Sequence, residues 1–313
     1  MRRIRLVILI AFLVSMVSPA SKALSNGQPT RFPGLTMPSN GVVGGDLKPG
    51  DLVRDYGVGA YVPPPGSGVW ADAVLATGGS EELGLATETD GTVIEFALGD
   101  ESQDGGGGGT SPAPCIDAQY NEQIWLVSGT FNWYFRAGSV PSEVTVDNAR
   151  TAFRDATGNI TQENNDCGWP DRISATSLYK GDTTDVTDVH SDGTCNSIIN
   201  VDAVNQAEFG PISTSGVLAV TCTVWNLSGY VVDSDARVNT NYTWYVNLGP
   251  NCVSKWSVEA VMTHERGHTF GIAHVSESAH GRLTMSTQID GPCQAQEKTL
   301  GAGDMLGLEA YYS

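Results

Sequence analysis

Residues 263–274 read Thr-His-Glu-Arg-Gly-His-Thr-Phe-Gly-Ile-Ala-His, and this stretch is the most informative part of the chain. In a helix, residues four positions apart lie one turn apart on the same face, so the imidazoles of His264 and His268 can reach one metal ion. Gly271 can take the left-handed conformation that ends a helix, which lets the chain turn back and present His274 to the same ion. Three imidazoles leave a fourth position of a tetrahedral zinc ion open for water, which is typical of a catalytic site.

Glu265 directly follows the first of these histidines, so its carboxylate projects beside the metal rather than onto it. A general base for a zinc-bound water has to lie there. The whole chain has five histidines, and three of them occupy the ligand positions. The stretch therefore predicts Zn²⁺ bound by His264, His268 and His274, with Glu265 as the catalytic residue.

The eleven residues 264–274 resemble the long zinc-binding motif of the metzincin peptidases, in the version closest to the matrixin-like secreted proteases. Residues 283–286, Leu-Thr-Met-Ser, are similar to the Met-turn, whose methionine (here Met285) lies beneath the zinc ligands in that family. Residues 300–311 are similar to the terminal helix of matrixins, and looser similarity extends back to about Gly129. The resemblance implies an α+β catalytic domain of two lobes, with a twisted mixed sheet, a zinc-binding helix, a Met-turn and a C-terminal helix.

The resemblance also implies the activity. We expect a secreted, zinc-dependent endopeptidase that hydrolyses peptide bonds of extracellular proteins, acting as a monomer on a protein or peptide substrate. Val275 stands where matrixins usually have serine or threonine. Ser286 stands where they often have tyrosine, so a tyrosine from the turn is not expected to stabilise the oxyanion. The alternative is a catalytically silent zinc-containing binding or adhesion module. Retention of Glu265 favours the enzyme, because a silent module has no use for a base.

The N-terminus has the features of a secretory signal peptide over residues 1–23. A basic start precedes an apolar run over residues 6–17, and Ser-Lys-Ala at 21–23 provides a cleavage site with small residues. Twelve residues are too few for a membrane-spanning helix, which needs about 20. We therefore expect release into the extracellular space and no stable association with a membrane.

Charge narrows the class of partner further. The formal net charge is −18, and removal of the four basic residues in the segment 1–23 makes it −22. A protein this acidic is repelled by nucleic acids and by anionic membranes, so neither is expected as a partner. The acidity suits an extracellular protein, and calcium (Ca²⁺) is a candidate structural ion.

The chain has six cysteines, all beyond residue 114, and an even number in an exported protein indicates disulfides. No two of them have the short Cys-x-x-Cys spacing of a thiolate zinc site. Six cysteines allow fifteen pairings. Of these we favour Cys252–Cys293, which brackets the predicted zinc helix and Met-turn, together with Cys195–Cys222 and Cys115–Cys167.

A glycine-rich linker, residues 105–114, divides the mature chain. Before it, residues 24–104 contain short alternating segments that predict strands, such as 69–75 and 92–96. We favour a pro-segment that is removed on activation over a small β-rich extension, because exported proteases usually need a latent form. Matrixin pro-segments often block the zinc with a cysteine, but residues 24–114 contain none. An aspartate is the simplest candidate for a blocking ligand, and the sequence does not indicate which one.

Residues 115–313 are enough for one compact catalytic domain with its own core. The pattern predicts strands at 130–135, 216–225, 230–241 and 243–246. It also predicts an amphipathic helix over 141–156 and the zinc-binding helix from Ser257, as N-cap, to Phe270. A last helix is expected over residues 300–311.

Acidic residues before and within the strand at 230–241 form the remaining candidate sites. Residues 182–192 hold four aspartates and His190, and we interpret this stretch as a solvated loop, with calcium or a second structural metal as the alternative. Asp233 and Asp235 alternate along the strand and face one side of it. We expect these two to be structural, with calcium again the alternative. His280 is expected to be an exposed loop residue.

Overall fold

In the computed structural model, residues 42–43, 46–96, 111–294 and 296–313 are described. The predicted signal peptide lies outside these residues, as does most of the predicted glycine-rich linker. Within the described part of the chain, no helix combines the length and the apolar content needed to cross a bilayer.

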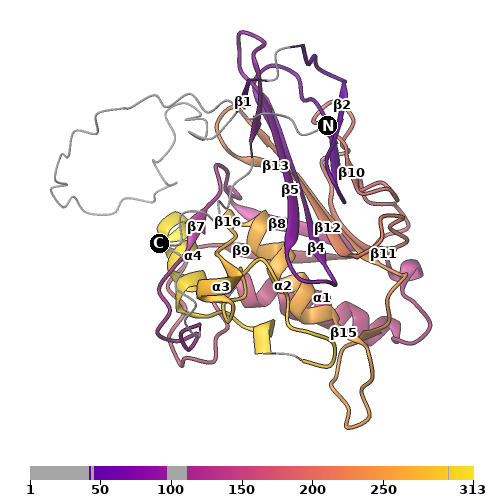
Figure 1. The fold of residues 1–313 in the computed structure, drawn as a ribbon, viewed down its shortest axis with the longest axis vertical. Helices are drawn as coiled ribbons and strands as arrows, with labels where there is room; N and C mark the ends of the chain where they lie inside the picture. Colours follow the sequence, from indigo (N-terminus) through magenta and orange to yellow (C-terminus); the bar gives the residue numbers. More distant parts are fainter. Residues whose placement is uncertain (1–41, 44–45, 97–110, 295) are drawn as a thin grey trace, which may run out of the picture. The chain divides into compact units, whose positions relative to one another are not determined.

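The described residues form a mixed α+β structure with a large mixed sheet and few helices, which confirms the predicted class at that level (Figure 1). The strands are β1 Val42–Val43, β2 Leu52–Arg54, β3 Gly59–Tyr61, β4 Ser67–Leu75, β5 Ser80–Thr87, β6 Val93–Phe96, β7 Asn121–Glu122, β8 Thr130–Phe135, β9 Thr176–Asp182, β10 Thr194–Cys195, β11 Asn205–Gly210, β12 Val217–Asn226, β13 Val231–Asn239, β14 Trp244–Tyr245, β15 Trp256–Ser257 and β16 Ile272–Ala273. The α-helices are α1 Val146–Thr161, α2 Val258–Thr269, α3 Glu277–His280 and α4 Ala302–Tyr312.

Nine strands form the main sheet in the order β1-β6-β5-β4-β12-β13-β11-β8-β9. Strands β9, β8, β11 and β13 are parallel to one another, and β12 is antiparallel to β13. From β12 outward, β4, β5, β6 and β1 pair with antiparallel neighbours. The sheet therefore consists of a mostly parallel half from the region after the linker and an antiparallel half from residues 42–96.

The alternating pattern of β8 explains why the parallel half binds helices on one face. Phe131, Trp133 and Phe135 are buried, while the residues between them are exposed or half-buried. These rings contribute to the main hydrophobic core together with residues of α1 and α2. Phe135 and Phe153 of α1 lie with ring centroids 4.8 Å apart. The side-chain period of two thus fixes which face of the sheet carries the helices.

Helix α1 starts five residues later than the sequence pattern predicts. Its N-cap is Thr145, whose side chain accepts a hydrogen bond from the backbone N–H of Asn148 at 3.2 Å. The preceding residues form a turn in which Val144 donates to the carbonyl of Pro141, so Val144 is buried ahead of the helix. The capping side chain sets the start, because it satisfies one of the free N–H groups of the first turn.

Helix α2 agrees with its prediction at both ends. The side chain of Ser257 accepts a hydrogen bond from the N–H of Ala260 at 3.2 Å, as an N-cap does. Every residue of α2 is buried, apart from the partly buried Glu259. After Phe270 the chain turns at Gly271, whose φ is +91°. A side chain at this glycine would also meet the carbonyl oxygen of Trp125 at 2.5 Å, so only glycine fits.

The region before the linker is built into the same sheet as the region after it. Strand β4 lies between β5 and β12, and its nine residues pair with β12 from Ser67↔Asn226 to Leu75↔Val217. Figure 1 shows the indigo strands β4 and β5 running alongside β12. One face of β4 contributes Val69, Ala71 and Ala73 to a second hydrophobic core, which it shares with residues of β12.

Three disulfides join the cysteines as favoured from the sequence. They are Cys115–Cys167, Cys195–Cys222 and Cys252–Cys293, with Cα–Cα distances of 5.3, 5.5 and 5.7 Å. These distances lie within the ordinary range for such bonds. All three bonds lie after the linker, so none of them joins residues 42–96 to the rest of the chain.

A buried ion pair holds β11 against β13 and generates a prediction on stability. Glu208 is fully buried and accepts hydrogen bonds from Arg237, Arg136 and Thr187. Replacing Glu208 with Ala would leave the buried guanidinium of Arg237 without its partner. We expect Glu208→Ala to lower the free energy of unfolding by about 3–5 kcal/mol.

Urea unfolding followed by circular dichroism would measure this loss. Glu143 is exposed, so Glu143→Ala should change stability by less than about 0.5 kcal/mol and serves as the matched control. Equal stability of the two variants would show that Glu208 does not support the sheet.

Candidate metal centre

Three imidazoles converge at the C-terminal end of α2. The Nε2 atom of His264 lies 2.9 Å from that of His274 and 3.1 Å from that of His268, and the remaining pair is 3.0 Å apart. His264 and His268 come from successive turns of α2, and His274 follows β16 after the turn at Gly271. The structure thus brings together all three histidines that the sequence predicts as ligands.

The second ring nitrogen fixes the tautomer of His264 and of His268. The Nδ1 of His264 donates to the carbonyl oxygen of Thr284 at 2.8 Å, and that of His268 donates to the carbonyl oxygen of Ile272 at 3.0 Å. A carbonyl oxygen can only accept, so each proton sits on Nδ1. In a neutral ring Nε2 then carries a lone pair. Lone pairs facing one another at 3 Å repel, and a shared cation resolves that repulsion.

Burial favours the neutral form of His264 and His268. All three are almost completely removed from solvent. Desolvation, with a smaller effect of the neighbouring imidazoles, lowers the pKa of His264 to about 3 and also lowers that of His268. The unprotonated imidazole is the form that binds a metal, so the site is prepared for one at neutral pH.

The spacing fits a tetrahedral zinc ion. Ligand nitrogens at about 2.0–2.1 Å from such an ion lie about 3.3–3.4 Å from one another. The three Nε2–Nε2 distances are a few tenths of an ångström shorter, which a slight outward movement of the rings would accommodate. Each Nδ1–H donated to a backbone carbonyl also orients its ring, as is usual for metal-binding histidines.

Glu265 lies next in the helix after His264, and both of its carboxylate oxygens are buried without a close hydrogen-bond partner in the described residues, although the hydroxyl of Thr221 is near enough to lower its pKa. Desolvation raises its pKa to about 8. An unpaired buried carboxyl group is costly for a fold, and such groups occur mainly where they have a function. The group is suited to exchanging a proton near neutral pH.

A fourth residue at this site, Asp72 of β4, was not identified from the sequence. Its carboxylate oxygens lie 3.6 Å from Nε2 of His268 and 3.8 Å from Nε2 of His274. Ligand atoms of Asp72 and the three histidines all lie within 4.8 Å of one another. Asp72 is fully buried, neither of its oxygens has a hydrogen-bond partner in the described residues, and burial together with the charge of Glu265 raises its pKa.

The adjacent strand β5 also reaches the site. The Nδ1 of His274 contacts the carboxylate of Glu82 and lies 3.2 Å from the hydroxyl of Ser80. Both residues belong to the region before the linker. That region therefore supplies one potential ligand, Asp72, and one carboxylate that orients a ligand ring.

Met285 lies directly beneath α2. A side chain added at Gly267 would meet its sulfur at 2.1 Å, so the glycine allows the methionine to approach the helix. The turn that carries Met285 is held by Asp304 of α4, which accepts hydrogen bonds from the N–H groups of Thr284 and Met285 at 3.0 and 3.1 Å. The carbonyl of Thr284 in turn orients His264. Asp304 thus positions the ring of His264, a candidate metal ligand, through the turn.

The acidic residues predicted along β13 are also brought together. Asp233 and Asp235 are buried, and their carboxylates lie within 4.8 Å of that of Asp188, so Asp188 does not belong to a merely solvated loop. Desolvation raises the pKa of Asp233 to about 7. The cluster has the oxygen ligands that calcium prefers, so calcium stays the alternative to the structural role that we expect of Asp233 and Asp235. The neighbouring Asp192 instead pairs with Arg54.

His280 is not an exposed loop residue, contrary to expectation. It ends the short helix α3, its side chain is 18% exposed, and its Nδ1 lies 2.9 Å from the carboxylate of Asp117. The contact with Asp117 explains the partial burial.

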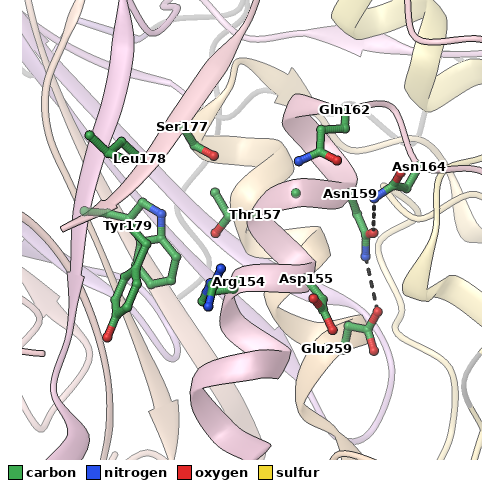
Figure 2. A pocket seen from close by; sticks show the side chains of 12 residues that line it. Arg154, Asp155, Thr157, Asn159, Gln162, Asn164, Ser177, Leu178, Tyr179 and Glu259 are labelled. Carbon is green, nitrogen blue, oxygen red and sulfur yellow. Dashed lines mark hydrogen bonds between the residues drawn. The ribbon is translucent and has the colours of Figure 1, made fainter. Parts of the chain in front are cut away.

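A hollow of about 530 Å³ lies between α1 and β9 (Figure 2). It is lined mainly by polar side chains, among which Asn159 is hydrogen-bonded to Asn164 and Glu259 (Figure 2). None of the three histidines nor Glu265 lines it. We therefore place the candidate site at the imidazoles and not at this hollow.

The chain matches no model of a known protein family, and it matches none of the curated proteins with which it was compared. The interpretation of the site accordingly rests on its own geometry and on the motif that carries it.

The geometry predicts one zinc ion per chain and its loss on removal of a ligand. We expect His268→Ala to reduce bound zinc to well below one equivalent after dialysis against metal-free buffer, because two imidazoles hold zinc much more weakly than three. Elemental analysis of the dialysed protein would measure this. His280→Ala removes a histidine outside the cluster and should keep one equivalent. Full zinc retention in His268→Ala would contradict the assigned ligands.

Proposed function

We propose that this chain is a secreted zinc-dependent endopeptidase of the metzincin type, related most closely to matrixins. The observation that carries the proposal is the convergence of three buried imidazole nitrogens next to the buried carboxyl group of Glu265. The remaining features that the resemblance implies are consistent with it. These are a mixed sheet packed with helices, Met285 beneath α2 and the terminal helix α4.

The chemistry divides between the ion and the protein. A zinc ion bound by the three imidazoles would polarise the scissile carbonyl and lower the pKa of a water molecule toward neutrality. Glu265 accepts a proton from the attacking water as its oxygen bonds to the carbonyl carbon. The same carboxyl group then delivers the proton to the amide nitrogen as the C–N bond breaks, so that a carboxylic acid and an amine leave.

The substrate strand has an evident binding edge. Strand β12 is the last strand of the half-sheet formed after the linker, and its outer side pairs with β4. An extended peptide could add to this edge by main-chain hydrogen bonds, which is a common mode of peptide recognition. Thr221 and Thr223 of β12 face the same side as Asp72 and Trp70 of β4. A peptide on the path of β4 would therefore pass directly over the imidazoles.

We expect Glu265→Gln to lower hydrolysis by at least about 100-fold, because glutamine keeps the shape but cannot take a proton. Bound zinc should remain at one equivalent. The measurements are casein digestion, with and without a chelator, and elemental analysis of the same preparation. Near-normal digestion by the variant would rule out Glu265 as the base. No digestion by the activated wild-type enzyme would instead favour the silent binding module.

We further propose that residues 42–96 keep the enzyme latent, as expected of a pro-segment. Strand β4 occupies the substrate edge along its whole length, and Asp72 stands where the fourth ligand of the ion would be. With these strands in place, the three histidines and Glu265 have no more than 1% of their surface exposed. No peptide or water has access to the site in this arrangement. An aspartate thus takes the blocking role for which the sequence offers no cysteine.

Export is supported by the cysteines and by the N-terminal sequence. Three disulfides and no free cysteine are found among the described residues, as in proteins that fold in an oxidising compartment. The basic and apolar start of the chain provides a signal for such a route.

The latency proposal makes a prediction for the uncut protein. Asp72→Ala removes the blocking carboxylate, so a small ligand should then reach the metal more readily. We expect the zinc-loaded full-length variant to bind acetohydroxamate, a zinc-directed ligand, at least about tenfold more tightly than the full-length wild type. Isothermal titration calorimetry would measure both affinities.

Asp55→Ala is the matched control, because Asp55 lies in the same region but outside the cluster. Equal acetohydroxamate affinity of Asp72→Ala and the wild type would argue against Asp72 as the blocking group.

A further inference from the structure

Strand β4 presents three alternate side chains to the side of the sheet that carries the metal centre. Asp72 lies at the imidazoles, Val74 enters the main core, and Trp70 packs into a separate aromatic cluster. The residues between them point to the opposite face, as the two-residue period of a strand requires. Strand β4 therefore occupies the proposed substrate edge in the way that a bound peptide would. Its side chains indicate where the side chains of a substrate would lie.

Trp70 packs against two tryptophans, Trp125 and Trp225, which belong to the region after the linker. Its ring centroid lies 5.7 Å from that of Trp125, which is stacked on Trp225 at 4.5 Å with an interplanar angle of 21°. All three side chains are fully buried. Trp125 is fixed to α2, because its indole N–H donates to the carbonyl oxygen of His268 at 3.0 Å. The aromatic wall and the metal ligands are thus parts of one rigid unit.

The covering residues come from the region before the linker. Trp70 contacts Phe96 of β6 with centroids 6.0 Å apart, and Phe96 also lies against Trp225. When residues 42–96 leave, the side chains of Trp70 and Phe96 leave with them. Trp125 and Trp225 would then form an open apolar surface beside the metal centre, on the side that the N-terminal half of a bound peptide would cross. Such a surface is a binding site for another flat, apolar side chain.

A glycine in β4 indicates a second preference. Gly68 pairs with Trp225, and a side chain there would meet the indole ring at 2.1 Å. Trp225 therefore lies across the backbone of the bound strand two residues before Trp70. A peptide with any larger residue at this position would have to displace the ring, which is itself held by Trp125.

We infer that the enzyme, once freed of residues 42–96, selects peptides with a Gly-x-aromatic sequence on the N-terminal side of the cleavage site, with the aromatic residue two positions before the residue that lies at the metal. The aromatic side chain binds against Trp125 and Trp225, and the glycine passes beneath the edge of Trp225. This inference rests on the proposed peptidase function and names the substrate class of that same site. The side-chain alternation of β4 places the aromatic residue two positions before the residue at the metal.

The test uses the full-length chain, folded and then cut within the glycine run 105–109 at an introduced site for a specific protease. No disulfide of the described residues crosses that point. The zinc-loaded product is incubated with a peptide library and the cleavage positions are determined by mass spectrometry. We expect peptides with an aromatic residue at the Trp70 position to be cleaved about tenfold faster than those with alanine, and glycine to be enriched two residues earlier.

The variant that tests the site is Trp225→Ala. The aromatic-to-alanine rate ratio should fall toward one, because the wall that binds the ring is gone. Trp169→Ala is the matched control: Trp169 is half-buried, stacks on Arg172 and does not belong to the aromatic cluster. This control should keep the wild-type ratio. Cleavage without any preference at either position would overturn the inference and leave the peptidase assignment intact.

A binding experiment separates the two proposals if the cut protein cleaves no peptide. Absence of cleavage with zinc bound would count against the peptidase function itself. The aromatic site is then judged with a labelled peptide of sequence 67–75 and its Trp70→Ala counterpart. We expect fluorescence polarisation to show at least about tenfold tighter binding of the tryptophan peptide to the cut protein. Equal affinities of the two peptides would overturn the inference independently of turnover.

Discussion

Three buried imidazoles face one another through their Nε2 atoms, and this constraint governs the architecture around them. Because His264 and His268 donate to backbone carbonyls, their Nε2 lone pairs have no hydrogen-bond donor among the residues that the structure describes. Helix α2 supplies two of the rings, and Gly271 supplies the turn that returns the third. The rest of the fold holds these parts in place. Trp125 donates a hydrogen bond to the carbonyl oxygen of His268 at the end of α2, and Asp304 accepts one from the N–H of Thr284 in the turn that orients His264. A metal ion is the one partner that all three nitrogens could share.

The second consequence concerns charge. Glu265 and Asp72 are both fully buried, and neither makes a close hydrogen bond within the described residues. The two carboxyl groups also interact unfavourably with each other near the imidazoles, because the charge of Glu265 raises the pKa of Asp72. Arg266 is the nearest buried cation in the helix, but its guanidinium lies over the rings of Phe131 and Trp133, at 5.0 and 5.5 Å. It stabilises the helix against β8 and forms no hydrogen bond to either carboxylate. A divalent cation at the rings would supply the positive charge that the two carboxyl groups lack.

The sequence was sufficient for the parts of the site that are local in the chain. The spacing of His264, His268 and His274 predicts their convergence, because helix geometry and one glycine decide it. Ser257 likewise predicts the start of α2, and the bracketing of that helix predicts the Cys252–Cys293 bond. Asp72 was not predictable in this way, because its place depends on the pairing of β4 with β12 about 150 residues away. The available signal was weak: an isolated acid in an otherwise apolar strand, without a basic residue nearby.

Helix α1 and Asp188 also show what could not be predicted from the local sequence. A stripe of apolar residues over 141–156 indicates a helix, but the hydroxyl of Thr145 decides where it begins. Asp188 belongs to a polar loop in sequence, yet the fold carries that loop to β13, where Asp233 and Asp235 lie. Both outcomes depend on contacts that a periodic pattern does not contain. Local periodicity predicts which elements exist, while capping and long-range pairing decide their ends and their partners.

The way in which β4 is held determines how the proposed latency would end. Strands β1, β6, β5 and β4 pair with one another, and β3 of the same region pairs with β10. Residues 42–96 can therefore leave only if the β4–β12 and β3–β10 ladders and the packing beneath them are broken. Each backbone hydrogen bond in these ladders contributes only about 1 kcal/mol net. The linker keeps the departing strands close to β12, at an effective concentration that favours their return. Opening without a cut would therefore be brief. A cut in the linker removes that advantage and lets a substrate strand compete for the edge on equal terms.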